Sequence, residues 1–178
     1  HILNAAISLE KDVLNRIGYR MVKRNRELDV DGIQQYMDYA QGIGNFQLIT
    51  DAFFLRNNTG IFNSKWNRIN AEAYYTTKIL VPGYKLIIDE NEVRALDSDS
   101  ITSTAMNYRE HRFYINSNNS LKTKFGISYA FREDKSPVDG IMAKSNESQT
   151  TQLFVNSNLS ANQLLNFLFT YRDNLYYL

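Results

Sequence analysis

The histidines are the first residues in this sequence whose chemistry could support catalysis or metal binding. His1 and His111 are far apart in the chain, and His111 lies within Glu110-His111-Arg112, where a strand is expected to begin. A metal site needs several convergent ligands, and an imidazole acts as an acid or base only when its neighbours position it. We therefore interpret both histidines as solvent-exposed groups outside any metal or catalytic site.

A second group is the acidic cluster Asp89, Glu90, Glu92, Asp97 and Asp99. Carboxylates are the ligands that calcium prefers, but the twelve-residue calcium loop with its closing glutamate is missing. We interpret the cluster as part of an exposed acidic loop. Gly-rich phosphate loops, nucleophile elbows and Cys/His metal spacings are also missing from the sequence, so we expect no enzymatic activity, no cofactor and no metal.

Composition narrows the class of protein. The 178 residues include 20 basic and 19 acidic side chains, a balance that gives no electrostatic reason to expect a nucleic-acid partner. Cysteine is absent, which excludes disulfide frameworks and thiolate metal sites. No run of eighteen apolar residues is present, so a transmembrane helix is not expected. The 12 Tyr and 10 Phe, beside many Asn and Ser, suit aromatic strands joined by polar turns.

The clearest structural pattern runs from Ser120 to Arg132. Side chains alternate across a strand, so a period of two predicts β-structure with one apolar and one polar or small face. The alternation is longer than an average globular strand and matches the roughly nine to eleven residues of a tilted membrane-spanning strand. One face holds Leu121, Thr123, Phe125, Ile127, Tyr129 and Phe131, and the other holds Lys122, Lys124, Gly126, Ser128, Ala130 and Arg132.

Alternation of the same kind predicts further strands over 45–54, 68–79, 108–116, 149–158 and 162–173. Pro82-Gly83 is expected to end the strand that contains Ile79. Short turns are expected near 57–60, 118–119 and 159–161, and long loops at 81–106 and 133–148, with a small hairpin over 84–88 as an alternative within the first loop. Alternating short and long connections are typical of outer-membrane barrels, which have short periplasmic turns and longer extracellular loops.

Residues 1–44 have a less clear pattern. Strands over 2–9 and from Val13 to Met21, joined by a turn at 10–12, compete with a helix over the same stretch. Asp31-Gly32 followed by Ile33, Tyr36, Met37 and Ala40 has helical spacing behind an N-cap, which predicts a short loop helix over 32–41.

Together, the alternation, the Asn-rich turns and the aromatic residues toward strand ends (Tyr108, Tyr129, Phe131, Tyr171) resemble an outer-membrane β-barrel. The Asn, Tyr and Lys-rich style is similar to the large barrels of Bacteroidota-type outer membranes, which include porin-like, nutrient-import and secretion-translocon barrels. The resemblance implies an all-β, antiparallel up-and-down transmembrane barrel or a segment of one. We expect about seven or eight strands in one unit, 1–178, with 45–178 forming a meander.

The resemblance also assigns residues to faces. The side chains that would face the lumen or its mouth are Arg68, Glu72, Lys78, Lys122, Lys124 and Arg132. Those that would face lipid carry no charge, as a barrel requires. They are Ile69, Tyr75, Ile79, Leu121, Phe125, Ile127, Tyr129, Phe131, Leu165, Phe167, Phe169 and Tyr171.

Two functions follow as hypotheses. The first is the wall of a pore, importer or secretion translocon in a bacterial outer membrane, with membrane lipid as a partner. The alternative is a soluble, secreted or cell-surface all-β binding or structural module. If the three short turns lie on the periplasmic side, Leu178 ends outside, whereas bacterial barrels keep both termini in the periplasm. We therefore expect a segment of a larger barrel, partnered by its remaining strands or by other outer-membrane subunits.

Overall fold

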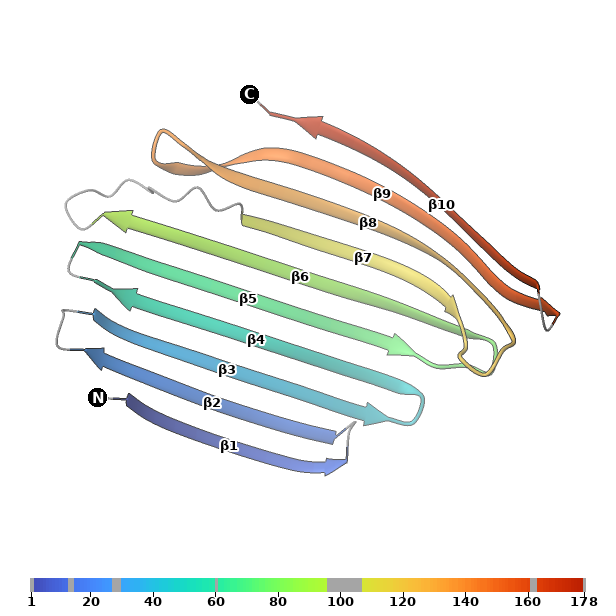
Figure 1. The fold of residues 1–178 in the computed structure, drawn as a ribbon, viewed down its shortest axis with the longest axis horizontal. Coiled ribbons are helices and arrows are strands. Elements are labelled where there is room, and N and C mark those ends of the chain that lie inside the picture. The colour runs from blue at the N-terminus through green and yellow to red at the C-terminus, as the bar shows by residue number, and fades with distance from the viewer. Residues whose placement is uncertain are drawn as a thin grey trace.

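In the computed structural model, ten strands pair in chain order to form one antiparallel up-and-down sheet (Figure 1). The structure describes residues 2–12, 15–26, 30–59, 61–95, 107–160 and 163–177. The prediction of an all-β antiparallel meander is confirmed. The strands are β1 (Ile2–Asp12), β2 (Asn15–Arg26), β3 (Val30–Ile43), β4 (Phe46–Asn58), β5 (Phe62–Tyr75), β6 (Leu80–Ala95), β7 (Asn107–Ser117), β8 (Thr123–Val138), β9 (Ile141–Ser160) and β10 (Gln163–Tyr176).

The register carries the alternation of each strand across the whole sheet. Residues that are directly paired lie on the same face, so a row of paired residues crosses the sheet perpendicular to the strands. One such row contains Phe113, Tyr129, Thr151 and Tyr171. We call the face that holds this row the apolar face and the opposite one the polar face.

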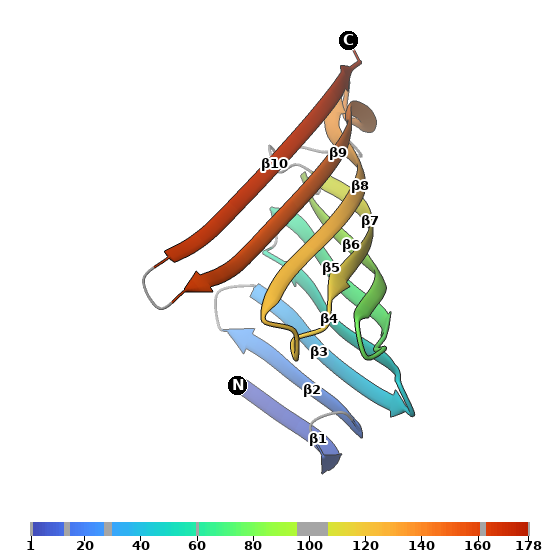
Figure 2. The same cartoon turned by 90° about the vertical axis from the view of Figure 1, so that its right-hand side faces the viewer.

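The sheet is curved, with β9 and β10 bending out of the plane of β6 and β7 (Figure 2). Exposure differs between the two faces over the central parts of β7 to β9. On the apolar face, Phe113 and Ile127 are 55% and 47% exposed, whereas Ala130 and Glu110 on the polar face are buried. Side chains converge on the inside of a curved sheet and diverge on the outside. The polar face is therefore the inner one over these strands.

The expected helix over 32–41 is wrong, because these residues belong to β3. Ile33, Tyr36, Met37 and Ala40 have helical spacing only because both faces of this strand carry apolar groups. Ile33 and Met37 lie on the apolar face, while Tyr36 and Ala40 lie on the polar face. The turn expected at 10–12 is also misplaced, since Glu10 and Asp12 pair with Arg16 and Asn15 within the β1–β2 hairpin.

The expected loop at 81–106 is wrong over its first part, because β6 continues through Pro82 to Ala95. Proline cannot donate a ladder hydrogen bond and is tolerated at the start of a strand. Along β6, pairing with β5 begins at Gly83, the residue after Pro82. The missing N–H of Pro82 therefore removes no hydrogen bond between β6 and β5. Residues 96–106 lie outside the described part of the chain.

The expected loop at 133–148 is also wrong. β8 and β9 form a long hairpin with a bulge at Asp134/Lys135 and a two-residue turn at Asp139-Gly140. Asp139 and Gly140 have φ values of 50° and 78°, and two central residues with positive φ match the turn that suits the twist of a hairpin. An Asp-Gly pair favours this turn, so the chain reverses here within two residues.

The expected placement of the three short turns on one side is wrong. The connection after β4 lies at the opposite end of the sheet from the connection after β7, because three strands, β5 to β7, separate them (Figure 1). At the end that contains residues 118–122, the other connections are 13–14, 44–45, 76–79 and 161–162, so every one is short. The connection between β6 and β7 at the other end spans 96–106.

The sheet is not closed. Among the described residues, β1 pairs with β2 alone and β10 with β9 alone, so each has one edge without a partner strand. The described residues form ten strands rather than the expected seven or eight, because β3 and β6 replace a helix and a loop. Within the same part of the chain, no helix is long and apolar enough to cross a membrane.

Engineered cysteines test the register of β3. Because Tyr39 pairs with Thr50, the variant with Tyr39→Cys and Thr50→Cys should form a disulfide on mild oxidation. Paired strand residues have Cα separations of about 4.5–5.5 Å, within the range that a disulfide accepts. The matched control Tyr39→Cys with Asp51→Cys places the thiols on opposite faces and should stay reduced in a non-reducing gel. Equal cross-linking of both variants would contradict this register.

Candidate functional site

The polar face concentrates the charged and hydrogen-bonding side chains of the sheet, and one row of the register organises them. This row crosses seven pairings from β2 to β9 and combines basic, aromatic, acidic and amide groups. Because it runs perpendicular to the strands, residues distant in sequence become neighbours. Its members are Arg20, Tyr36, Phe53, Arg68, Asp89, Tyr108, Asp134 and Asn146.

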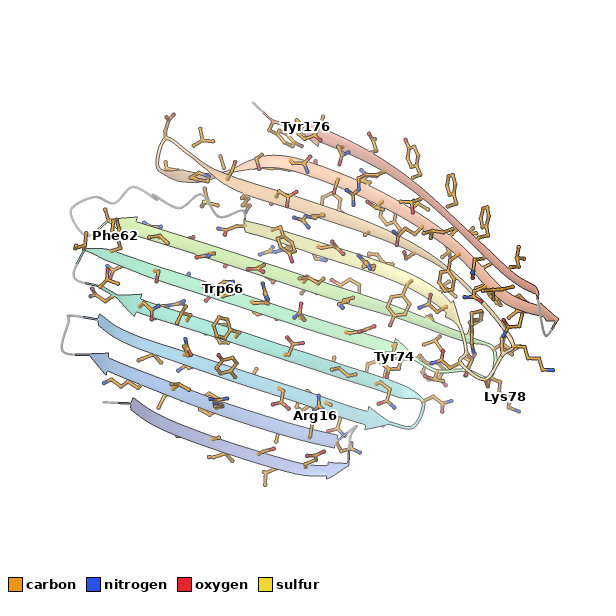
Figure 3. The ribbon with its side chains drawn as sticks, in the orientation of Figure 1. Arg16, Phe62, Trp66, Tyr74, Lys78 and Tyr176 are labelled. Atoms are coloured by element: carbon orange, nitrogen blue, oxygen red, sulfur yellow. The ribbon has the colours of Figure 1, made fainter. Side chains whose placement is uncertain are left out.

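Two residues of this row, Tyr36 and Phe53, form an aromatic strip with Trp66, which lies in the next row on the same face. The Phe53 ring lies 5.0 Å from the Tyr36 ring and 5.0 Å from the Trp66 ring, which it meets edge-on. The Arg20 guanidinium lies 5.7 Å from the Tyr36 ring centre, within cation–π range. The strip lines a groove of about 520 Å³ that also includes Asp38, Asp51 and Arg68. Trp66 lies on β5, away from both ends of the strand (Figure 3).

Asp89 fixes the end of the strip. Its carboxylate accepts hydrogen bonds from Trp66 Nε1 at 2.7 Å and from Arg68 Nε and Nη2 at 2.9 and 2.7 Å. Asp89 is buried, and a buried carboxylate is tolerated when a cation and hydrogen-bond donors compensate the lost hydration. The Arg68 guanidinium also lies 5.0 Å from the Trp66 ring centre. Asp89 thus sets the orientation of both neighbouring side chains.

A second cluster of polar side chains lies closer to the end of the sheet that contains residues 118–122. Tyr114 on β7 donates a hydrogen bond from Oη to Glu72 on β5 at 2.6 Å, so its side chain crosses β6. Glycine at position 83 makes this crossing possible, since a Cβ there would lie 2.2 Å from the Tyr114 ring. Glu72, Tyr114, Lys85 and Arg112 line a groove of about 320 Å³.

Ion pairs continue along the polar face between these clusters. Arg112 pairs with the buried Glu110 at 2.8 Å, and Arg132 pairs with the buried Asp134 at 2.7 Å. The Arg132 guanidinium also stacks over Tyr108, 3.9 Å from the ring centre. Each pair links neighbours two residues apart on one strand, which holds the arginine close to the sheet. The face is therefore polar and rich in arginine side chains that are held by ion pairs and hydrogen bonds.

Beyond the apolar residues of β9, Glu147 accepts a hydrogen bond from Tyr177 Oη at 2.6 Å and contacts Lys144 Nζ at 3.1 Å. The Tyr177 hydroxyl, together with Lys144, lowers the pKa of Glu147. This carboxylate stays partly exposed, so the contacts stabilise its charge without removing it fully from solvent.

The structure brings together four of the six predicted lumen-facing residues. Arg68, Glu72, Lys124 and Arg132 lie in strands on the polar face, and Lys124 Nζ donates to the carbonyls of Asn118 and Asn119. The expected strand positions of the other two are wrong. Lys78 lies in the 76–79 connection, beyond the ends of the strands, and Lys122 lies in the 118–122 connection (Figure 3).

Ten of the twelve predicted lipid-facing residues lie on the apolar face, on β5, β8 and β10. The register places Phe125 beside Val155 and Phe167, and Ile127 beside Leu153 and Phe169. The expected strand positions of Ile79 and Leu121 are wrong, because both lie in connections at the sheet's end. The remaining predicted residues are Ile69, Tyr75, Tyr129, Phe131, Leu165 and Tyr171.

His111 is placed within β7, on the apolar face, rather than at an exposed strand end. Its Nδ1 lies 2.7 Å from Tyr84 Oη, and this hydrogen bond satisfies a polar group among apolar neighbours. Asp97 and Asp99 lie outside the described residues. Across the described ranges, no group of three or more His, Asp or Glu side chains is arranged to hold a metal ion.

Sequence reasoning missed the aromatic strip. The local pattern predicts a helix for Tyr36 and a strand for Phe53, and it makes no prediction for Trp66. The signal that unites them is the register of β3, β4 and β5, which depends on recognising β3 as a strand.

Searches of family models, curated proteins and solved structures found no match to this chain.

The variant Gly83→Val tests the crossing of β6 by Tyr114. The added side chain should displace the Tyr114 ring, break its bond to Glu72 and lower the free energy of unfolding by about 1–3 kcal/mol, typical of overpacking. Denaturant titration measures the loss. In a Tyr114→Ala background the same change should cost much less, because the space is empty. An equal loss in both backgrounds would contradict the contact.

Proposed function

We propose that this chain forms part of the wall of an outer-membrane β-barrel that serves as a pore, an importer or a secretion translocon. The observation that supports this most is the charge-free band of the apolar face. Lys, Arg, Asp and Glu are missing across this band in every described strand from β2 to β10, although 22% of the chain is charged. Bilayer hydrocarbon imposes such a pattern, since a mid-membrane Lys or Arg on the lipid face costs about 2–4 kcal/mol.

The edge of this band is inclined to the strands in the way that a barrel requires. Counting outward along the apolar face, the first charged residues are Lys23, Arg56 and Lys65, all in one row of β2, β4 and β5. The edge then moves inward by one row at Glu90 of β6 and by a second row at Arg109 of β7. Strands of a barrel tilt and stagger, so a band level with the membrane must drift across the register.

The last strands continue this drift. Glu133 and Glu147 share the row of Arg109, and Asp173 of β10 lies one row farther inward. The direction of the shift is therefore the same from β5 to β10. A band parallel to the register would have no such shift, whereas tilted strands in a membrane of fixed thickness produce it.

The polar face provides the lining that a water-filled or plugged lumen needs. It is the inner face of the curve over β7 to β9, and its ion pairs hold arginine side chains close to the sheet. The aromatic strip with Arg20, Arg68 and Asp89 offers ring surfaces beside charged groups, a suitable contact for polar solutes or chains passing along the wall. We infer that this face contacts the transported species.

The unpaired edges of β1 and β10 fit a wall that continues into further strands. In lipid, each backbone group without a hydrogen-bond partner costs several kcal/mol, so membrane sheets close on themselves. We propose that these two edges pair with further strands of the barrel or with other outer-membrane subunits, as the sequence led us to expect.

The alternative is a soluble or cell-surface all-β module. In that case the apolar face would pack on another protein layer, because exposed apolar patches on soluble monomers rarely exceed a few hundred Å². Phe113, Phe167 and Phe169 are each at least half exposed on this face, so a protein layer large enough to cover all three would be needed. The inclined edge of the apolar band favours the membrane over this alternative.

Membrane fractionation distinguishes the two functions. The protein should sediment with the outer membrane and stay there after alkaline carbonate washing, because hydrophobic burial in the bilayer does not depend on charge. Detergent should release it. Recovery in the aqueous fraction without detergent would contradict the proposed membrane function and favour the soluble module.

A matched pair of neighbouring residues on β8 tests the orientation of the wall. Ile127→Arg puts a charge on the proposed lipid face and should abolish or strongly reduce insertion, at a cost of about 2–4 kcal/mol. Ser128→Arg puts the same charge on the polar face and should leave insertion largely intact while changing conductance or selectivity. Folding into vesicles and single-channel current provide the measurements. Equal tolerance of the two variants would argue against this orientation.

A further inference from the structure

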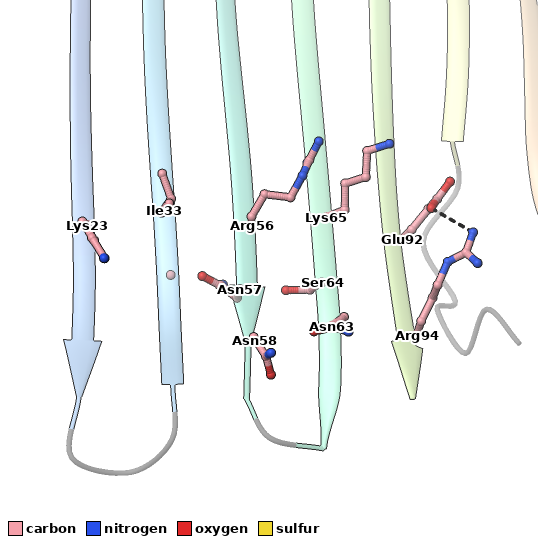
Figure 4. A pocket seen from close by; sticks show the side chains of 11 residues that line it. Lys23, Ile33, Arg56, Asn57, Asn58, Asn63, Ser64, Lys65, Glu92 and Arg94 are labelled. Atoms are coloured by element: carbon pink, nitrogen blue, oxygen red, sulfur yellow. Dashed lines mark hydrogen bonds and ion pairs between the residues drawn. The ribbon is translucent and has the colours of Figure 1, made fainter. Parts of the chain in front are cut away.

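The charged row at the edge of the apolar band forms a groove near the ends of β2 to β6. Its volume is about 470 Å³, and Lys23, Arg56, Lys65, Glu92 and Arg94 contribute its charged lining (Figure 4). Lys23, Arg56, Lys65 and Glu92 belong to one row, with Ile33 between the first two. Charged side chains from β2, β4, β5 and β6 thus line the same groove.

The groove carries an excess of positive charge. Among the described residues that line it, four basic side chains against one carboxylate give a net charge of +3. Glu92 is paired with Arg94 at 3.5 Å, and Arg56 Nη1 donates to Leu55 O and Asn67 Oδ1. These contacts hold Arg94 and Arg56 in place without neutralising the charges of Lys23, Arg56 and Lys65.

The other half of the same edge differs. There Lys135 and Lys144 pair with Glu133 at 3.5 and 3.6 Å, and Lys144 also pairs with Glu147. Acidic and basic groups are matched over β8 and β9, so that half has no comparable cationic excess. The positive charge is concentrated over β2 to β6.

The groove is continuous with the apolar band. The next row inward holds Met21, Phe54 and Asn67, and the row after it holds Tyr19, Met37 and Ala52. An anionic ligand in the groove that also carries acyl chains would lay those chains along this apolar surface. A free anion would gain only the electrostatic part of the interaction.

We propose that this groove binds the anionic headgroup phosphate of a membrane lipid whose acyl chains lie on the apolar band. The inference rests on the proposed membrane function and adds a lipid-specific site to it. Lys23, Arg56 and Lys65 supply the positive charge, while Asn58 and Asn63 border the groove with amides. Glu92 opposes an anion and sets the affinity below its maximum.

Native mass spectrometry of the detergent-solubilised protein tests the site, with phosphatidylglycerol as the anionic probe and phosphatidylcholine as the neutral one. The wild-type protein should bind phosphatidylglycerol preferentially. A triple variant, Lys23→Gln, Arg56→Gln and Lys65→Gln, should lose about a hundredfold in affinity for phosphatidylglycerol, at about fivefold per basic residue. Glu92→Gln should strengthen binding, a gain that a misfolded variant would not show.

The matched control is Lys135→Gln with Lys144→Gln, which removes paired cations from the other half of the edge and should change the affinity by less than about threefold. An equal loss in both variants, or no preference for phosphatidylglycerol, would overturn the proposal. Competition by millimolar inorganic phosphate would also overturn it, in favour of a general anion site. If the protein fractionates with the membrane but shows no lipid preference, only this inference fails; if it is aqueous, the proposed function fails as well.

Discussion

The hydrogen-bonded register of the sheet is the constraint on which the other features depend. Because side chains alternate and paired residues share a face, ten strands in one meander produce two surfaces that extend across the whole sheet. A slip of one residue in any pairing would move every side chain of that strand to the opposite face. Tyr129, for example, would leave the row of Phe113 and Thr151 and enter the polar face. The difference in polarity between the two faces therefore favours a single register.

Curvature adds a second constraint, which explains the small residues of the polar face. On the inner side of the curve, side chains approach one another, and the positions beside large groups are occupied by small residues. Gly83 lies under the Tyr114 ring, and Gly126 lies beside Phe154, where a Cβ would come within 2.5 Å of the ring. Ala130 is buried on the same face. Polar side chains on this face are therefore held in defined positions, as the Tyr114–Glu72 contact illustrates.

The sequence predicted the strands whose two faces differ most in polarity and missed those in which both faces carry apolar groups. β8 was recognised because Phe125, Ile127 and Tyr129 alternate with small or polar residues. β3 was mistaken for a helix because Tyr36 and Ala40 lie on its polar face, where Tyr36 contacts Phe53 and Arg20. These contacts involve other strands, so local periodicity carries no trace of them.

The hairpin of β8 and β9 and the aromatic strip were missed for related reasons. Asp139-Gly140 has the composition of a two-residue turn, but the charged and proline-containing residues around it made a long loop the simpler interpretation. Asp89 was assigned to an acidic loop, since its partners Trp66 and Arg68 are 23 and 21 residues away. A single sequence shows which residues alternate, whereas the register decides which of them meet.

The final strand combines these constraints at the edge of the sheet. On β10, Phe167 and Phe169 continue the apolar face, while Leu164 and Leu168, 59% and 69% exposed, make part of the polar face apolar as well. A strand that lines an aqueous lumen on one side has no reason to carry exposed leucines there. Under the proposed function, a neighbouring strand or subunit that pairs with the free edge of β10 would cover these leucines while satisfying its backbone groups. The composition of β10 and its unpaired edge therefore favour the same arrangement, in which the wall continues beyond this strand.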